Sequence, residues 1–296
     1  MKQLLSILPV FLILLSCNKK DSPLFREIKS AASGLTFNNE IKENEQLNMI
    51  NYQYLYNGGG VGIGDFNNDG LPDIYFTASL TPNRLYMNRG NMTFEDVTEI
   101  AGVGGERKWS RGATIVDINN DGLLDIYVCA AAWQNAELKK DLLYINTGID
   151  QAISTPRFRE SAASYGLIDT VSTHMATFFD YDNDGDLDLI INNVNQEAMV
   201  YRNGSREKNK NNYVAVSVNY EAPNTFGIGS TIRIFQGDQI ITREVIPSRG
   251  FQSSIDYKQT IGLGKSTIDS ILIRWPNRTT TSIIKPAINQ SHNITY

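Results

Sequence analysis

One nine-residue pattern recurs three times in this chain, and each copy places oxygen-bearing side chains at alternate positions around a central glycine. The copies read DFNNDGLPD from Asp65, DINNDGLLD from Asp117 and DYDNDGDLD from Asp180. Their first residues lie 52 residues apart (65 to 117) and then 63 residues apart (117 to 180). Carboxylates crowded in this way repel one another unless a cation lies between them. Each copy therefore predicts a loop that closes around a metal ion.

Positions 1, 3, 5 and 9 of each loop present side-chain oxygens, and position 7 would contribute its backbone carbonyl. The predicted metal ligands are Asp65, Asn67, Asp69, Leu71 and Asp73, then Asp117, Asn119, Asp121, Leu123 and Asp125, then Asp180, Asp182, Asp184, Asp186 and Asp188. Oxygen donors without histidine or cysteine favour calcium over zinc or copper. Position 6 is glycine in every copy, where the loop must bend sharply around the ion. The spacing thus predicts about three Ca²⁺ ions.

The loops differ from an EF-hand, in which a bidentate glutamate stands at position 12 and a helix follows. Here position 12 is Phe76, Val128 or Ile191, and a β-rich stretch follows each loop. The ninth-position aspartate must then close the site. A plain polar turn would explain one such loop, but it does not explain three with the same glycine and the same following strand.

The surroundings of the loops repeat as well, with a strand-like run before each loop and two after it. Propeller blades of roughly 40–50 residues have this kind of period. Outer-strand sequences follow two of the units at 94–103 and 158–167, and a matching stretch, FREIKSAASGL, stands near the N-terminus at 25–35. We expect this N-terminal strand to complete a blade. Three units are fewer than the four to eight blades of typical propellers. The chain could therefore form an open arc, associate with copies of itself, or be a shortened form of a longer parent protein.

These motifs resemble FG-GAP/VCBS repeats, the calcium-bearing blades also found in the integrin α-subunit propeller, over residues 25–204. The resemblance implies that calcium stabilises one face of the blades and that ligands bind elsewhere. After a linker at 205–212, strand-like runs such as STIRIFQG and DSILIRWP predict a small antiparallel β domain at 213–296. Its segments GIGSTIRI, REVIPSRGFQSS and IGLGK resemble the ASPIC/UnbV domain. The expected fold is all-β, with partial or shortened propeller-type blades followed by this domain.

The N-terminus predicts an export signal rather than part of the fold. Residues 1–17 combine Lys2 with an apolar run and end in LLSC, which resembles a bacterial lipobox with Cys17 as the lipidated residue. Residues 18–24 would form a tether, as in Bacteroidetes-type lipoproteins, some of which reach the outer surface. Ordinary secretion with cleavage near Ser16 is the alternative. The resemblance implies a lipid-anchored protein of the bacterial cell envelope, at the outer membrane and in some cases exposed on the surface.

Composition and motifs argue against nucleic acid and against catalysis. The chain holds 27 basic and 32 acidic residues, whereas nucleic-acid binding needs a basic face. It has two histidines and no nucleophile elbow or P-loop, and carboxylates committed to calcium are withdrawn from proton transfer. We therefore expect a calcium-binding, membrane-anchored, non-catalytic module for binding or adhesion to a glycan or protein, capable of self-association. The alternatives are a polysaccharide-processing enzyme or its accessory subunit, and a structural component of an envelope assembly. Trp109, Trp133 and Tyr54 are the aromatic candidates for stacking on sugars.

Overall fold

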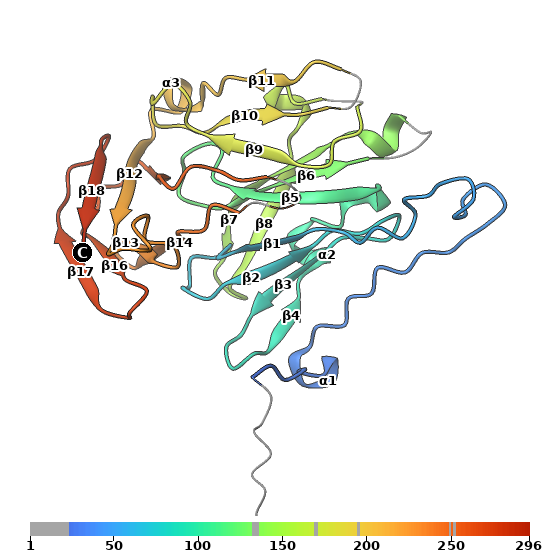
Figure 1. The fold of residues 1–296 in the computed structure, drawn as a ribbon, viewed down its shortest axis with the longest axis horizontal. Helices are drawn as coiled ribbons and strands as arrows, with labels where there is room; N and C mark the ends of the chain where they lie inside the picture. The colour runs from blue at the N-terminus through green and yellow to red at the C-terminus, as the bar shows by residue number, and fades with distance from the viewer. Residues whose placement is uncertain (1–23, 132–135, 169–170, 194–195, 249, 251–252) are drawn as a thin grey trace, which may run out of the picture.

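The computed structural model describes residues 24–131, 136–168, 171–193, 196–248, 250 and 253–296. Within them the chain forms five small sheets and short helical turns (Figure 1). Three sheets follow one another as blades, and the other two form a C-terminal domain, which confirms the predicted all-β fold. The described part of the chain holds no helix long and apolar enough to cross a bilayer. The predicted signal with Cys17, and Trp133, lie outside the described residues.

Each blade is a meander in which strands pair antiparallel with their neighbours in chain order. Blade 1 consists of β1 (Val61–Gly64), β2 (Asp73–Phe76), β3 (Arg84–Asn88) and β4 (Phe94–Asp96); blade 2 of β5 (Ser110–Val116), β6 (Asp125–Ala130), β7 (Leu142–Asp150) and β8 (Thr155–Glu160); blade 3 of β9 (Ala176–Phe179), β10 (Asp188–Ile191) and β11 (Met199–Tyr201). The helical turns are α1 (Ser30–Ser33), α2 (Thr98–Ala101), η1 (Gly105–Arg107), η2 (Ala136–Lys139), η3 (Ala163–Tyr165) and α3 (Ser205–Asn209). Blade 3 has three strands in the described residues, so β11 is the outer strand of its sheet.

The blades are held together by apolar side chains that alternate along the strands, so that each blade presents one set to each neighbour. The core between blades 1 and 2 includes Tyr75, Leu85, Met87, Ile126 and Val128, all fully buried. The core between blades 2 and 3 includes Tyr127, Leu143, Phe178, Leu189 and Ile191. On β1, Gly62 and Gly64 face Ile115 of blade 2 so closely that a Cβ atom would overlap its side chain. The two glycines therefore let β1 and β5 approach.

The N-terminal segment differs from its prediction. Residues 24–29 form no strand, and residues 30–33 form the turn α1, which ends at Gly34 with a left-handed φ of 79°. Gly34 lies against the carbonyl of Phe94 on β4, and the ring of Phe37 stacks on Phe76 with centroids 4.9 Å apart. The segment thus packs on blade 1, far from blade 3 (Figure 1). As an outer strand, the segment would belong to a blade that precedes blade 1. The described chain contains no such blade, so the segment has no strand to pair with.

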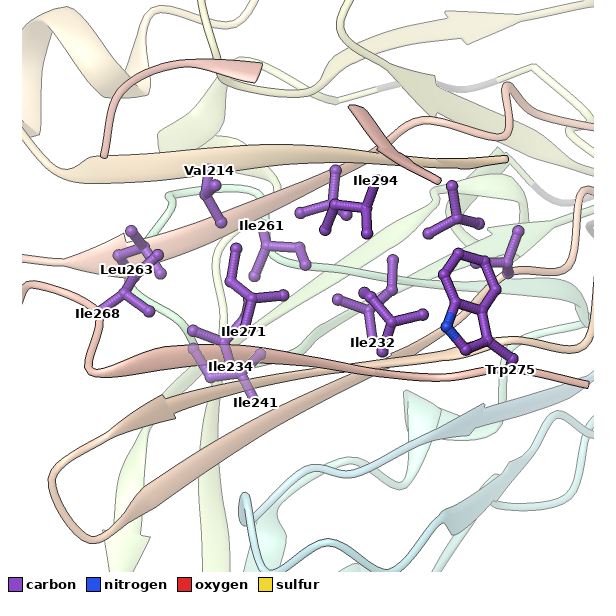
Figure 2. Packing of buried hydrophobic residues seen from close by; sticks show 14 residues of the cluster. Val214, Ile232, Ile234, Ile241, Ile261, Leu263, Ile268, Ile271, Trp275 and Ile294 are labelled. Atoms are coloured by element: carbon purple, nitrogen blue, oxygen red, sulfur yellow. The ribbon is translucent and has the colours of Figure 1, made fainter. Parts of the chain in front are cut away.

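The C-terminal domain is a sandwich of two sheets around one core. Its strands are β12 (Asn212–Asn219), β13 (Thr231–Gln236), β14 (Gln239–Glu244), β15 (Gln259–Gly264), β16 (Ser270–Arg274), β17 (Thr280–Ile284) and β18 (Ser291–Thr295). The sheet β15-β12-β18 faces the sheet β14-β13-β16-β17, and Figure 2 shows Val214 and Ile261 of the first packed against Ile232 and Ile271 of the second. The predicted small antiparallel domain is confirmed, with one parallel pairing between β12 and β18. Part of the predicted linker forms α3.

Candidate metal centres

All three aspartate loops connect the first and second strands of a blade, and their ends are fixed by strand pairing. The residue before position 1 pairs with the aspartate at position 9: Gly64 with Asp73, Val116 with Asp125, and Phe179 with Asp188. The glycines at position 6 have φ values of 88°, 90° and 96°, and the asparagines at position 4 have values of 55°, 57° and 59°. Glycine and asparagine are the residues that tolerate this left-handed region best. The repeated sequence therefore gives a repeated backbone path.

The aspartate at position 1 gathers backbone N–H groups from the far side of the loop. Asp65 accepts hydrogen bonds from the N–H groups of Asp69 (3.0 Å) and Gly70 (2.8 Å). Asp117 accepts the equivalent bonds from Asp121 (3.1 Å) and Gly122 (3.0 Å). These bonds curl each loop around its own carboxylates, which is the arrangement that a bound cation needs.

The aspartate at position 9 closes the hairpin through backbone contacts. Asp73 accepts from the N–H groups of Phe66 (2.9 Å) and Asn88 (2.8 Å), using both carboxylate oxygens. Asp125 and Asp188 repeat this pattern with the asparagines Asn146 and Asn203 of their own blades. Each carboxylate oxygen keeps a further lone pair for a metal. Position 9 therefore has a structural role that the spacing did not reveal, and its role as a ligand remains a prediction.

The predicted ligands at positions 3 and 5 lie together. In loop 1 the Asn67 amide donates to Asp69 at 2.9 Å, and in loop 2 the Asn119 amide donates to Asp121 at 2.9 Å. In loop 3 the carboxylate oxygens of Asp180, Asp182 and Asp184 lie within 4.8 Å of one another, as an oxygen-coordinated cation requires. The backbone carbonyls of Leu71 and Leu123, together with that of Asp186, remain predicted ligands.

Burial makes these carboxylates poorly stable as anions without a cation. Loss of solvation raises the pKa of Asp65 to about 6, that of Asp117 to about 7 and that of Asp73 to about 8. In loop 3 the Oδ1 atom of Asp180 and the Oδ1 atom of Asp186 are buried and have no hydrogen-bond partner. An oxygen-only donor set with orphaned buried oxygens fits Ca²⁺. The residues present therefore fit the predicted metal.

Loop 3 differs from the other two because an arginine lies against it. The Arg202 guanidinium contacts Asp182 at 2.8 Å, Asp184 at 2.9 Å and Glu207 at 2.6 Å, and it holds the pKa of Asp182 below its usual value. Arg202 stands directly before the asparagine at the end of the third strand in blade 3. The residues at the same position are Met87 in blade 1 and Ile145 in blade 2, and both are apolar and buried. Among the described ion pairs, Arg202 thus places a guanidinium from the end of the third strand of the same blade directly on the candidate ligands of loop 3.

Asparagine side chains also link the loops to one another, a role that the spacing of the oxygen ligands does not predict. The Asn68 amide donates to the carbonyl of Gly122 (3.2 Å), and the Asn120 amide donates to the carbonyl of Gly185 (2.6 Å). In the third strands, Asn146 donates to the carbonyl of Phe66 at 3.0 Å and Asn203 to that of Ile118 at 2.8 Å. The signal in the sequence was an asparagine at position 4 of all three loops. The three loops form one connected row.

The C-terminal domain packs on the middle of this row. Gly264 donates its N–H to the carbonyl of Asn120 at 2.9 Å, and Asn211 donates its amide to the carbonyl of Asn119 at 3.0 Å. Gly262 lies so close to Asp117 and to the Asn120 backbone that a Cβ atom would overlap them. Loop 2 is therefore enclosed between blade and domain.

The aromatic candidates separate clearly by exposure. Trp109 is 3% exposed and packs edge-on against Tyr52, with centroids 4.9 Å apart, so its role is in the core. Tyr54 is 62% exposed and Tyr56 is 61% exposed. Tyr54 and its neighbour Tyr56 both lie in the segment that leads into β1.

Together the blades and loops define an all-β protein of blade-forming repeats with a row of candidate calcium loops. Comparison with known proteins gives the names of the two parts: residues 65–128 match the model of the FG-GAP-like repeat, and residues 220–296 match the ASPIC and UnbV model. The chain therefore combines an FG-GAP-like repeat region with an ASPIC and UnbV domain, as the motifs predicted.

Known proteins with similar sequences cover part of this chain. Cartilage acidic protein 1 of Xenopus tropicalis is 28% identical over 202 residues, which cover 66% of this chain and 29% of the relative. The human protein of the same name is 30% identical over 155 residues, which cover 52% of this chain and 21% of that protein. This chain thus spans less than a third of the curated relatives that it matches.

Proposed function

We propose that this chain is a calcium-stabilised, non-catalytic binding or adhesion module that is held at the bacterial cell envelope by a lipid on Cys17. Its ligand would be a glycan or a protein, and nucleic acid is not expected. The apolar run before Cys17 supports export, and similarity to proteins named for cartilage supports an extracytoplasmic location. Calcium would neutralise the aspartate loops and fix the blades relative to one another.

The observation that carries this proposal is that the two ends of the blades differ: one end holds the aspartate loops and the other exposes large apolar and aromatic side chains. The loop end is occupied by the candidate calcium sites and covered at loop 2 by the C-terminal domain. The opposite end, where the chain enters β1, carries large exposed side chains: Met49, Ile50, Tyr54 and Tyr56 are 58%, 93%, 62% and 61% exposed. In Figure 1 this segment is the blue loop at the right, far from the C-terminal domain. We name residues 44–57 the rim segment.

The rim segment is anchored rather than loose. Leu55 is fully buried beside Trp109, and the Arg111 guanidinium contacts the hydroxyl of Tyr52 at 2.9 Å. The hydroxyl of Tyr56 donates to Glu43 at 2.9 Å. Tyrosines presented in this way give a large contact area at low cost in side-chain entropy, and their rings suit the apolar face of a sugar or of a protein side chain.

The proposal is tested by binding of the full chain to a glycan array and to extracted envelope polysaccharides, in calcium and in chelator. We expect Tyr54→Ala with Tyr56→Ala to weaken binding at least tenfold, which corresponds to about 1.4 kcal/mol. Phe226→Ala is the matched control, because Phe226 is 53% exposed on the C-terminal domain. Binding that survives the tyrosine changes would refute the rim as the site. Turnover of a polysaccharide would show that the chain is an enzyme and would refute the non-catalytic role.

A further inference from the structure

Blade 1 has an apolar face that its own chain leaves uncovered. In blade 2, Ala113 and Ile115 of β5 and Ile126 and Val128 of β6 pack against blade 1. Their counterparts in blade 1, by strand register, are Val61 and Ile63 of β1 and Ile74 and Phe76 of β2. Phe37 covers Phe76, but Val61 remains 56% exposed and Ile63 remains 55% exposed. We call this surface the front flank.

Blade 3 has the complementary uncovered face. In blades 1 and 2 the pairs Tyr75 with Leu85 and Tyr127 with Leu143 are fully buried against the next blade. The counterpart pair in blade 3 is Ile190 with Val200, of which Ile190 is half-buried and Val200 is 61% exposed. We call the face that carries Phe179, Ile190 and Val200 the rear flank. The two flanks are the two halves of one blade–blade interface.

Blade 3 also lacks an outer strand within the described chain. Blades 1 and 2 each have an outer strand that contains a phenylalanine two residues before an acidic residue, Phe94 or Phe158, and is followed by a helical turn and a left-handed glycine, Gly102 or Gly166. Blade 3 has no such strand in the described chain, which leaves β11 at the sheet edge. An unpaired strand edge is a template for pairing with another chain.

The N-terminal segment has the features of the strand that blade 3 lacks. It starts with FRE at 25–27, as β8 has FRE at 158–160, and continues through α1 to Gly34. A Cβ atom at Gly34 would meet the carbonyl oxygen of Phe94, as a Cβ atom at Gly102 would lie 3.6 Å from the carbonyl oxygen of Phe158. The segment therefore occupies the place of an outer strand in a blade that would precede blade 1. Its first side chains have no cover, since Leu24 is 98% exposed and Phe25 is 93% exposed.

From these complementary surfaces we infer that two copies of this chain associate head to tail, with the rear flank of each copy seated on the front flank of the other. β11 of one copy then pairs with residues 25–28 of the second, which completes blade 3. One copy cannot make this contact with itself, because β11 and α1 lie at opposite ends of the molecule (Figure 1). The proposed contact between the two flanks repeats the interface that already joins blades 1, 2 and 3. It does not depend on the ligand or on calcium.

The number of copies follows from the number of blades. Head-to-tail contacts produce a closed ring when the rotation closes and a filament when it does not. Two copies with three blades each give six blades, within the four to eight of typical propellers, whereas three copies give nine. The expected assembly is therefore a closed dimer.

The register of the new pairing is fixed by the existing blades. Tyr86 pairs with Asp96 in blade 1 and Tyr144 pairs with Glu160 in blade 2. The counterpart pair across the dimer is Tyr201 of one copy with Glu27 of the other. Because the N–H of Val97 donates to the carbonyl of Leu85, this position is a pair without mutual hydrogen bonds, where Cα atoms lie about 4.5 Å apart. That separation allows a disulfide.

The test is the mass of the full chain in mild detergent, by light scattering after size exclusion, together with cross-linking. We expect a dimer, and Ile63→Lys should raise its dissociation constant at least a hundredfold, because a charge would enter an apolar interface. Ile284→Lys is the matched control, since Ile284 is 71% exposed on the C-terminal domain. Circular dichroism should show both variants folded.

Cross-linking tests the register independently of the mass. Glu27→Cys combined with Tyr201→Cys should give a covalent dimer in which peptide mapping joins positions 27 and 201, whereas Glu27→Cys with Ser282→Cys should not. A monomeric wild type would overturn the inference. A dimer that is insensitive to Ile63→Lys, or an open ladder of higher oligomers, would overturn it as well.

Discussion

The side-chain amide of Asn120 in the second aspartate loop donates a 2.6 Å hydrogen bond to the backbone carbonyl of Gly185 in the third loop. Asn68 makes the equivalent bond from the first loop to Gly122 in the second. The second and third loops are therefore each held by a side chain of the loop before it. The candidate calcium sites are mechanically coupled through the backbone that would surround each ion.

Replacement of Asn120 by glycine tests this coupling with little change in backbone strain. Glycine accepts the φ of 57° found at Asn120, so the main loss is the buried amide that pairs with Gly185. We expect a decrease of about 1–3 kcal/mol in the free energy of unfolding, because a buried carbonyl loses its partner. Chemical denaturation in chelator measures it.

Asn91→Gly is the control for that substitution. Asn91 also has a left-handed φ, of 52°, and its side chain is exposed. Its replacement should change the free energy of unfolding by less than about 0.5 kcal/mol. Equal effects of the two substitutions would contradict a role for the Asn120 amide.

Calcium should stabilise the folded chain, and the loops should account for that effect. An ion that binds only the folded state adds about 2.7 kcal/mol per site at a hundred times its dissociation constant, which corresponds to roughly 4–5 °C in Tm for a chain of this size. Asp69→Ala, Asp121→Ala and Asp184→Ala together should abolish the rise. Asp238→Ala in the exposed turn after β13 is the control, and a calcium effect that persists in the triple variant would exclude the loops.

Local sequence was sufficient to predict the blades and the loops. The apolar runs of β2 and β6, the glycines at position 6 and the aspartates at positions 1 and 9 all act within one hairpin. Their effect is therefore visible in a short stretch of sequence. The pairing of Gly64 with Asp73 shows how directly the loop length sets the register.

Contacts between distant residues could not be predicted in the same way. Asn68 and Gly122 are separated by 54 residues, and nothing near either one indicates the other. Gly262 lies in β15 against Asp117, and no residue near it in the sequence indicates that contact. The N-terminal FRE segment has the sequence of an outer strand. It can form one only beside the edge of another strand, and local propensity does not indicate whether such an edge is present.

The chelated protein should become less stable as pH rises. A carboxyl whose pKa in the folded chain exceeds its unfolded value, near 3.9, favours folding at low pH and loses that contribution as pH rises through the folded value. Burial raises the pKa of Asp117 to about 7 and that of Asp73 to about 8. The loss should therefore extend from about pH 4 to pH 8.

Thermal unfolding at pH 5 and at pH 8 checks this dependence. In chelator the Tm should be lower at pH 8, and in calcium the difference should disappear or reverse, because the ion stabilises the ionised carboxylates. Asp73→Asn removes one of the groups and should reduce the slope in chelator. Identical pH profiles with and without calcium would show that these carboxyls are not coupled to the metal.

Gly262→Ala should disturb loop 2 from the side of the C-terminal domain. The added methyl group would overlap the Asp117 carboxylate and the Asn120 backbone, and overpacking of this kind costs about 1–3 kcal/mol. Gly58→Ala is the control, because a Cβ atom at Gly58 meets nothing within 4 Å. We expect calorimetry to show weaker calcium binding at one site in Gly262→Ala alone, and unchanged titrations would mean that the domain does not enclose the loop.

The third loop should bind calcium more weakly than the first two, and Arg202 should be the reason. Its guanidinium contacts Asp182 and Asp184, so an incoming ion must displace or tolerate a fixed positive charge. Replacement of Arg202 by methionine, the residue at the equivalent position of blade 1, removes that charge and should tighten one calcium site about tenfold or more, since a like charge at contact distance costs about 1 kcal/mol or more even when well solvated.

Arg274→Met on β16, outside the blades, is the control for loss of one positive charge from the chain. Calorimetric titration should show one tightened site in Arg202→Met and none in Arg274→Met. If the dissociation constants in Arg202→Met match those of the wild type, the arginine moves aside at no cost. The three loops would then differ in sequence without differing in affinity.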